Sequence, residues 1–301
     1  MKSRHWALAA ALGAGMLAGS PPALAGPLTA VHGDIKMELG NLDMGSTAYG
    51  DTPGQVCTSV AGCDAALPPG GSAPGAVGSE DTWGVFSVSR ILRGSTTLWT
   101  QGEGGDYLTA MFHGLSDHDV MVAADPFDAS RRLTRTFAVG GRMDIYRGTA
   151  DTYAAAAGLG VAGRTGVDQY TGITGGVLWL ALAFDLGVDA TALGQSSTYL
   201  NTFTNTNFAG QGQGVLSVVG GEAQALFDTN TIANGVGGLS DFRVSNTFQS
   251  DPAVPAWTVV STADLIGHTV PEPGSLALVG ASLAALGVAA RRRRPAVNPA
   301  P

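Results

Sequence analysis

The sequence has few charged residues and few cysteines. Charged side chains make up 13% of its 301 residues, and only two cysteines occur. It also contains no G-x-S-x-G, H-E-x-x-H or EF-hand motif, patterns that would carry a serine nucleophile, a zinc site or a calcium site. The sequence therefore matches none of these motifs of hydrolases and metal sites. We expect a protein that is not an enzyme, with a secreted hydrolase as the alternative.

The N-terminus has the pattern of a secretory signal peptide. Lys2 and Arg4 form a basic start, residues 6–19 form an apolar stretch, and small residues precede Gly26. The apolar stretch is too short for a permanent membrane anchor. We expect signal peptidase to cleave between Ala25 and Gly26, which removes residues 1–25.

Three parts follow one another at the C-terminus. They are an uncharged apolar run over residues 275–290, the tripeptide before it (Pro271, Glu272 and Pro273) and the basic cluster after it (Arg291, Arg292, Arg293 and Arg294). As a helix, the run would span about 24 Å, short of the roughly 30 Å hydrocarbon core, and snorkelling arginines would extend its reach. The arginines favour a cytoplasmic C-terminus. We expect a single transmembrane helix at 275–290 and a cytoplasmic tail at 295–301.

This tail, residues 271–294, resembles the PEP-CTERM sorting signal of Gram-negative surface and exopolysaccharide-associated proteins. The resemblance implies that an exosortase, a membrane-embedded cysteine transpeptidase, recognises Pro271, Glu272 and Pro273 and removes the span. The inner membrane would then hold the chain only transiently, through residues 275–290. A simple single-pass tail anchor is the alternative. The resemblance gives no family for the rest of the chain.

Between the two ends, residues 26–270 form a strongly acidic body. They contain 10 basic and 23 acidic residues, a net charge of −13. This charge argues against nucleic acid as a partner and against simple electrostatic binding to anionic membranes or acidic polysaccharides. Bridging divalent cations would still allow such contacts, and solubility alone also explains the charge. We expect no cofactor, with calcium kept open.

The two cysteines, Cys57 and Cys63, both fall in the exported body. An oxidising compartment and five intervening residues allow a local disulfide, worth on the order of 2 kcal/mol in the chain-entropy model. A redox pair would more often be C-x-x-C, and a zinc site would need two further ligands that no nearby histidine supplies. We expect a structural disulfide.

Alternating apolar and polar residues predict about a dozen short strands in the body. They cover residues 35–42, 83–92, 96–100, 107–114, 119–123, 133–146, 177–184, 198–205, 214–219, 223–227, 241–247 and 257–261. Glycine-containing turns separate most of them, among them Gly140-Gly141. The one helix that we expect covers 151–157, with Asp151 as its cap.

This pattern favours an all-β ectodomain, an antiparallel β-sandwich or jelly roll, over residues 26–262. Residues 263–270 would then form a short stalk before the sorting signal. Four tryptophans lie in apolar strand patterns, and we expect them in the core: Trp83, Trp99, Trp179 and Trp257.

One cluster of potential metal ligands stands out. It comprises His113, Asp117, His118 and Asp119, with Asp125 and Asp128 just beyond. If 107–114 and 119–123 pair as a hairpin, the turn at 115–118 brings imidazole and carboxylate groups to one end of the sheet, as a Ca²⁺ or Zn²⁺ site requires. A polar hairpin turn explains the same residues. We therefore assign no metal, catalytic or cofactor-binding residue.

Two functions remain as expectations. The first is a non-catalytic cell-surface or extracellular-matrix protein, with exosortase and signal peptidase as partners during export and exopolysaccharide or biofilm matrix as its surroundings. The second is a secreted carbohydrate-binding or carbohydrate-active protein that uses a metal-assisted loop over His113–Asp128.

Overall fold

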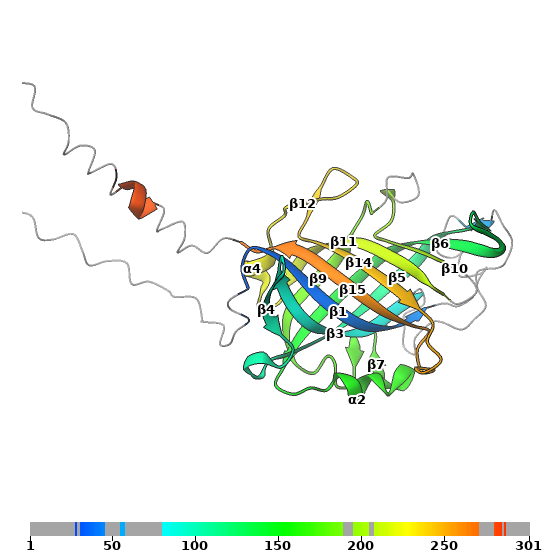
Figure 1. Ribbon diagram of the computed structural model, residues 1–301, viewed down its shortest axis with the longest axis horizontal. Coiled ribbons are helices and arrows are strands. Elements are labelled where there is room, and N and C mark those ends of the chain that lie inside the picture. Colours follow the sequence, from blue (N-terminus) through cyan, green and yellow to red (C-terminus); the bar gives the residue numbers. More distant parts are fainter. Residues whose placement is uncertain are drawn as a thin grey trace, which may run out of the picture.

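A computed structural model describes residue 28 and residues 31–45, 55–57, 80–188, 195–204, 208–270, 280–284 and 286, with the backbone alone at 55–57. Antiparallel strands dominate the fold (Figure 1). The long strands are β1 (Asp34–Gly45), β3 (Thr82–Arg93), β5 (Tyr107–Asp125), β6 (Asp128–Gly148), β9 (Val177–Asp185), β11 (Gly210–Gly220), β14 (Phe242–Gln249) and β15 (Val259–His268). Shorter strands are β2 (Gln55–Cys57), β4 (Thr96–Thr100), β7 (Arg164–Gly166), β8 (Gln169–Tyr170), β10 (Tyr199–Thr204), β12 (Ile232–Ala233) and β13 (Leu239–Ser240).

The eight long strands pair in a closed ring. Their order is β6, β9, β11, β14, β15, β1, β3 and β5, and pairing of β5 with β6 completes the ring. All of these pairings are antiparallel. The all-β antiparallel class is confirmed. The expected sandwich or jelly roll is wrong, because the sheet closes on itself and its two halves are joined by hydrogen bonds along both sides.

One position of the ring is shared by two strands. β9 pairs with residues 142–147 of β6 and with residues 215–220 of β11. β10 takes the same place further along, where it pairs with residues 133–138 of β6 and with residues 210–214 of β11. The ring is thus continuous at both ends, and β10 brings its inward side chains to the end at which β1 finishes.

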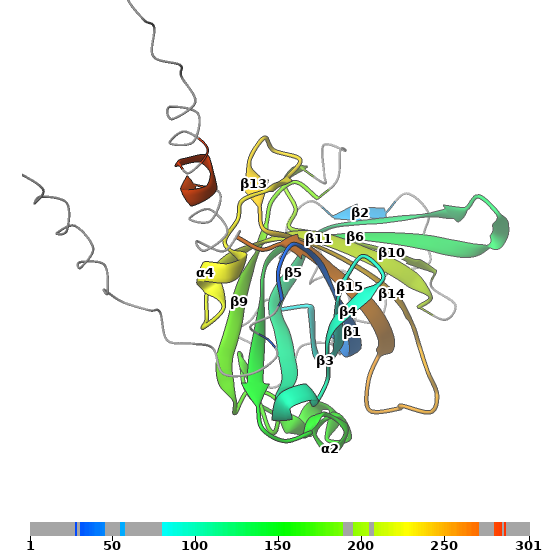
Figure 2. The same ribbon diagram turned by 60° about the vertical axis from the view of Figure 1, so that its left-hand side comes forward.

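The two longest strands bend at glycines. Gly114 in β5 and Gly140 and Gly141 in β6 have φ values of 75°, 73° and 98°, a left-handed conformation that other residues rarely adopt. Leu115 pairs with Gly140, so the bends lie side by side. The expected turn at Gly140-Gly141 is therefore a bend within β6, and β5 and β6 extend beyond it as a long hairpin (Figure 2).

A dry core fills the end of the barrel from which the C-terminal segment leaves. Inward side chains of β1 (Ile35, Met37) and β15 (Leu265) are almost completely buried there. The short helix α4 (Gln224–Phe227) covers this end, and its Phe227 contacts both Trp179 and Phe242. Residues 223–227, expected as a strand, thus form a helical turn instead.

The segment 149–176 covers the outside of β1, β3 and β5. It contains the helix α2 (Tyr153–Ala157) and the 3₁₀ turn η3 (Gly160–Gly163), and its Tyr170 packs with Trp83 and Trp257. Arg164 pairs with Glu80 at 2.5 Å in a buried ion pair and lies 4.5 Å over the Trp83 ring. The predicted helix is present over 153–157, and its N-cap is Thr152 instead of the expected Asp151. Asp151 accepts a hydrogen bond from the Tyr153 N–H at 3.3 Å.

All four tryptophans expected in the core are at most 5% exposed, so this prediction is confirmed. The expected stalk over 263–270 is wrong for most of its length, because residues 263–268 belong to β15 and pair with β1. The polar residues on the outward face of this part of β15 made it look like an exposed stalk in the sequence.

The calls on the ends of the chain concern residues outside the described ranges. They are the signal peptide and its cleavage at Ala25 and Gly26, the tripeptide 271–273, the cluster 291–294, and Cys63 with its disulfide to Cys57. Of the expected membrane helix 275–290, residues 280–284 and 286 are described and helical. Within the described ranges, no helix has the length and apolar character needed to cross a bilayer.

Candidate functional site

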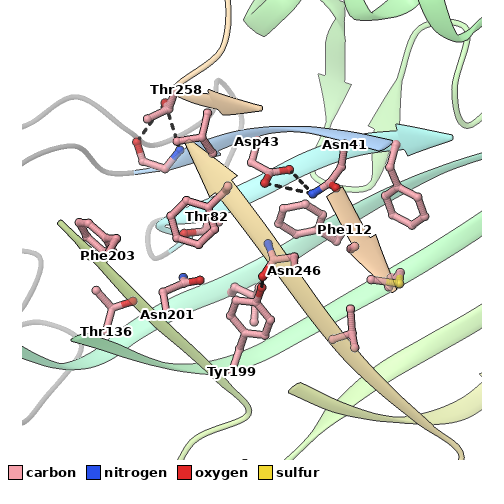
Figure 3. A pocket seen from close by; sticks show the side chains of 18 of the residues that line it. Asn41, Asp43, Thr82, Phe112, Thr136, Tyr199, Asn201, Phe203, Asn246 and Thr258 are labelled. Atoms are coloured by element: carbon pink, nitrogen blue, oxygen red, sulfur yellow. Dashed lines mark hydrogen bonds between the residues drawn. The ribbon is translucent and has the colours of Figure 1, made fainter. Parts of the chain in front are cut away.

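A cavity of about 90 Å³ lies inside the barrel, at the end where β1 finishes and β15 begins (Figure 3). Closed sheets of about eight strands have an interior just wide enough to be filled by side chains or to hold one small ligand. Here the interior is not completely filled. Polar lining residues are Asn41, Asp43, Thr82, Asp117, Thr136, Tyr199, Asn201, Asn246 and Thr258. Six phenylalanines line it as well, together with aliphatic residues and Gly45: Phe86, Phe112, Phe184, Phe203, Phe208 and Phe248.

The inward face of each strand changes character at the cavity. Alternate residues of β1 point inward, and the series runs Ile35, Met37, Leu39, then Asn41 and Asp43. On β14 the inward series changes from Phe242 and Val244 to Asn246 and Phe248. The register of antiparallel pairing therefore places polar groups from several strands at one level of the barrel.

Asp43 is held by hydrogen bonds inside this polar level. Its carboxylate accepts two bonds from the Asn41 Nδ2, at 2.9 and 3.1 Å, and one from the Ser261 hydroxyl at 2.9 Å. Burial removes the water that would stabilise its charge and raises the pKa of Asp43 to about 7, although these bonds oppose the shift. Asp43 thus changes charge near neutral pH.

Asp117 is a second buried carboxyl in the cavity. It sits at a bulge in β5, where the pairing with β6 shifts between Asp117 and Asp119. Burial raises its pKa to about 7, and a hydrogen bond from Thr136 opposes the shift. Its own N–H donates to the Asp81 carboxylate at 2.6 Å, which fixes the backbone of the bulge.

Over residues 210–214, strand β11 has only glycines on its inward face. Its inward positions at this level of the barrel are Gly210, Gly212 and Gly214, and side chains of neighbouring strands lie over them, while Gln211 and Gln213 point outward. A Cβ at Gly212 would meet the Tyr199 hydroxyl oxygen, the Asn246 Oδ1 and, at 2.7 Å, the Asn201 Oδ1. These three polar groups therefore gather over Gly212, where the Tyr199 hydroxyl donates to the Asn246 Oδ1 at 2.8 Å (Figure 3).

The polar lining contains an unsatisfied acceptor. The Asn41 side chain is 6% exposed, and its Oδ1 has no hydrogen-bond partner among the described residues. Buried polar atoms are nearly always paired with protein, water or ligand. None of the described lining residues is Lys, Arg or His. The cavity thus presents acceptors and two carboxyls without a basic side chain beside them.

The hairpin that would bring the potential metal ligands together is not present. Residues 107–125 form one strand, so no turn at 115–118 gathers the side chains. His113 lies near Asp144, with 3.4 Å between Nε2 and Oδ2, whereas His118 lies at the same distance from Asp119. Among the described residues no group of three or more His, Cys, Asp or Glu side chains could hold a metal ion.

Only Asp117 of that cluster reaches the cavity. Asp125 and Asp128 lie at the far tip of the β5–β6 hairpin, where their side chains accept backbone hydrogen bonds from Phe127 and Ser130. Asp128 also pairs with Arg131 at 3.0 Å. The polar-turn explanation therefore fits these last two carboxylates.

Sequence reasoning missed the other cavity residues. A signal was present in β1, where Asn41 and Asp43 continue the phase of the inward apolar residues instead of the outward polar ones. A second signal was the alternating series Gly210, Gly212, Gly214, which removes side chains from one face of a strand. Both patterns mark an inward surface that is polar or empty.

The comparison with known families concerns the C-terminal region. Residues 269–294 match the family described as the PEP-CTERM protein-sorting motif. The chain carries a PEP-CTERM sorting motif. The match begins directly after β15 ends at His268 and covers the tripeptide, the apolar run and the basic cluster, which confirms the resemblance. A PEP-CTERM motif indicates export with exosortase-dependent sorting. No curated protein and no solved structure matches the chain.

Proposed function

We propose that this PEP-CTERM protein is a non-catalytic surface or matrix protein, exported and then cut by exosortase within Pro271, Glu272 and Pro273. The observation that carries the proposal is the position of the motif. β15 is the last strand of the closed sheet, and the motif starts at the next residue after it. Cleavage within the tripeptide would therefore leave every strand of the barrel intact.

The proposal includes a transient stay in the inner membrane through residues 275–290, after signal peptidase has cut between Ala25 and Gly26. It also includes association of the released body with exopolysaccharide in the biofilm matrix. The body's net charge of −13 limits direct binding to acidic polymers, so we expect neutral polysaccharide or bridging by divalent cations.

The closed ring suits a protein that persists outside the cell. Ring closure gives each of the eight strands two neighbours in the ring, so the ring has no edge strand, the feature through which sheets otherwise pair with foreign strands. Glu80 and Arg164 add a buried, bidentate ion pair that fastens the outer segment 149–176 to the barrel. Breaking such a pair from one side typically costs about 3–5 kcal/mol.

The test is the C-terminal peptide of the protein recovered from cells and from the medium, identified by mass spectrometry. We expect an end within 271–273 in cells that contain the exosortase and the intact end at Pro301 in cells that lack it. Replacement of Glu272 by Ala should block the cut, whereas Pro299→Ala, outside the motif, should leave it unchanged. An intact C-terminus in exosortase-containing cells would overturn the proposal.

A further inference from the structure

The cavity inside the barrel has features that sorting and matrix attachment leave unexplained. Natural interiors are packed about as densely as organic crystals, and large voids are rare. Here polar and aromatic side chains surround a space that they do not fill. The size, lining and charge of this space indicate the kind of ligand that it would bind.

Its size limits what can lie deep inside. An engineered apolar cavity of about 150 Å³ accepts benzene, and the present cavity measures about 90 Å³, so its enclosed part is too small for a ring together with an arm. The lining passes from fully buried side chains such as Phe86 to half-buried ones such as Phe248 and Thr258. A ring would therefore lie toward the half-buried side, and only a short arm would reach inward.

Its walls combine phenyl rings with hydrogen-bond acceptors. Phe203 stacks with Phe208, with 5.8 Å between ring centroids, and Phe248 lies 6.2 Å from Phe203. A flat apolar ring would fit against such faces. Asn41 and Asp43 lie further along the cavity, beside Phe112 (Figure 3).

The polar groups of the lining favour a ligand that donates hydrogen bonds. Three of the hydrogen-bond donors that line the cavity are engaged: the Asn41 Nδ2 with Asp43, the Tyr199 hydroxyl with Asn246, and the Thr136 hydroxyl with Asp117. The Asn41 Oδ1 is left as a buried acceptor without a partner among the described residues. An N–H group of a ligand would supply the hydrogen bond that this acceptor lacks.

The charge favours a cation. Asp43 and Asp117 are both buried in the lining, and none of the described lining residues is basic. An ammonium group supplies three donors and a positive charge, and a hydroxyl supplies a single donor. Hydrogen bonds between an ammonium and a carboxylate are about twice as strong as neutral ones.

We propose that the barrel cavity is a binding site for a small organic amine with a single aromatic ring. The ring lies among the phenylalanines, and the ammonium group donates to the Asn41 Oδ1 and to the carboxylate of Asp43, with Asp117 adding negative charge to the same cavity. The site lies at the start of β15, and the sorting motif follows its end. Ten residues of strand, about 30 Å, separate the two, so the cavity faces away from the point of membrane attachment.

The test uses the full-length chain and three ligands of nearly equal size: benzylamine, benzyl alcohol and benzoate. Binding is measured by calorimetry at about pH 8, above the carboxyl pKa values, and located from the chemical shifts of the cavity phenylalanines. We expect benzylamine to bind at least about tenfold more tightly than benzyl alcohol, since a charged hydrogen bond contributes 1.5–3 kcal/mol. Benzoate should not bind.

Variants assign the preference to the carboxyls. Asp43→Asn keeps the shape of the side chain and should weaken benzylamine about tenfold or more, with benzyl alcohol unchanged within about twofold. Asp117→Asn, which removes a charge but no direct hydrogen bond to the ammonium group, should weaken benzylamine less. Asp128→Asn, at the distant hairpin tip, is the matched control and should change neither ligand. Thermal unfolding checks that each variant is folded.

Three results would overturn the proposal. The first is that benzylamine leaves the cavity phenylalanine shifts unchanged, which would mean that water alone fills the site. The second is that benzyl alcohol or benzoate binds as tightly as the amine. The third is that folded Asp43→Asn protein retains the full preference for the amine.

Discussion

The two halves of the barrel interior use the same strands but different chemistry. In the half next to the sorting motif, Ile35, Met37 and Leu265 pack into a dry core. Four to eight residues further along the same strands, Asn41, Asp43 and Ser261 face one another around a cavity. The comparison teaches that strand pairing and inward direction do not decide whether an interior is filled. The side chains at each level decide it.

The largest expected difference between the halves lies in two phenylalanines of β14. Phe242 is completely buried in the dry half, and Phe248 is half-buried at the cavity. We expect Phe242→Ala to lower the free energy of unfolding by about 3–5 kcal/mol, because it removes buried surface and leaves a void. Phe248→Ala should cost about 1–2 kcal/mol, since it borders space that already exists. Urea unfolding of both variants measures the difference, and equal losses would contradict the division into halves.

The second prediction concerns the pH dependence of stability. The pKa of Asp43 in the folded state is about 7, above the ordinary carboxyl value, so the folded state holds the proton more tightly. The resulting stabilisation is complete below about pH 4 and is lost as the pH rises through 7. Asp43→Asn removes this dependence. The variant should therefore gain stability relative to the parent between pH 4 and pH 8, by a few kcal/mol.

Comparing the variant with the parent cancels other titrating groups. Glu38, whose pKa is lowered by Lys36 and Arg90, and Asp128, whose pKa is lowered by Ser130, act in the opposite sense in both proteins. Urea unfolding at several pH values gives the difference. A constant difference between pH 4 and pH 8 would mean that Asp43 is not desolvated.

The smallest expected effect comes from glycines. A Cβ at Gly212 would collide with the three polar groups gathered there, whereas a Cβ at Gly40 on β1 meets nothing within 4 Å. We expect Gly212→Ala to cost about 1–3 kcal/mol through overpacking. Gly40→Ala should be neutral or stabilising by up to about 1 kcal/mol, because alanine loses less entropy on folding. Thermal unfolding compares the two variants. Equal effects would mean that no side chains pack closely over Gly212.

Much of the fold could be predicted from the sequence, because alternation marks most strands. The strand 96–100 has the predicted bounds, and β1, β3 and β9 extend the predicted ranges by one to three residues at an end. Closure of the ring could not be predicted, since an inward face alternates in the same way in a sandwich and in a barrel. Closure depends on the pairing of β5 with β6 and on their bends at Gly114 and Gly140, which sequence spacing suggests as separate turns.

The sorting motif could be predicted because it is local, with three parts in order along the chain. The cavity could not, because its residues come from strands far apart in the sequence, as Asn41 and Asn246 illustrate. The metal hypothesis failed for a related reason. It treated residues 115–118 as a turn because three of the four are polar, although they continue a strand in which Asp117 points into the interior.

The most direct measurement of the difference between the two halves is an NMR titration of the carboxyl carbons of Asp43 and Asp117. Burial in a cavity without a basic neighbour predicts that both titrate with pKa values of about 7. Values near 4, as for carboxyls in water, would contradict the account. They would mean that water reaches this half of the barrel freely and that the cavity is not a desolvated site.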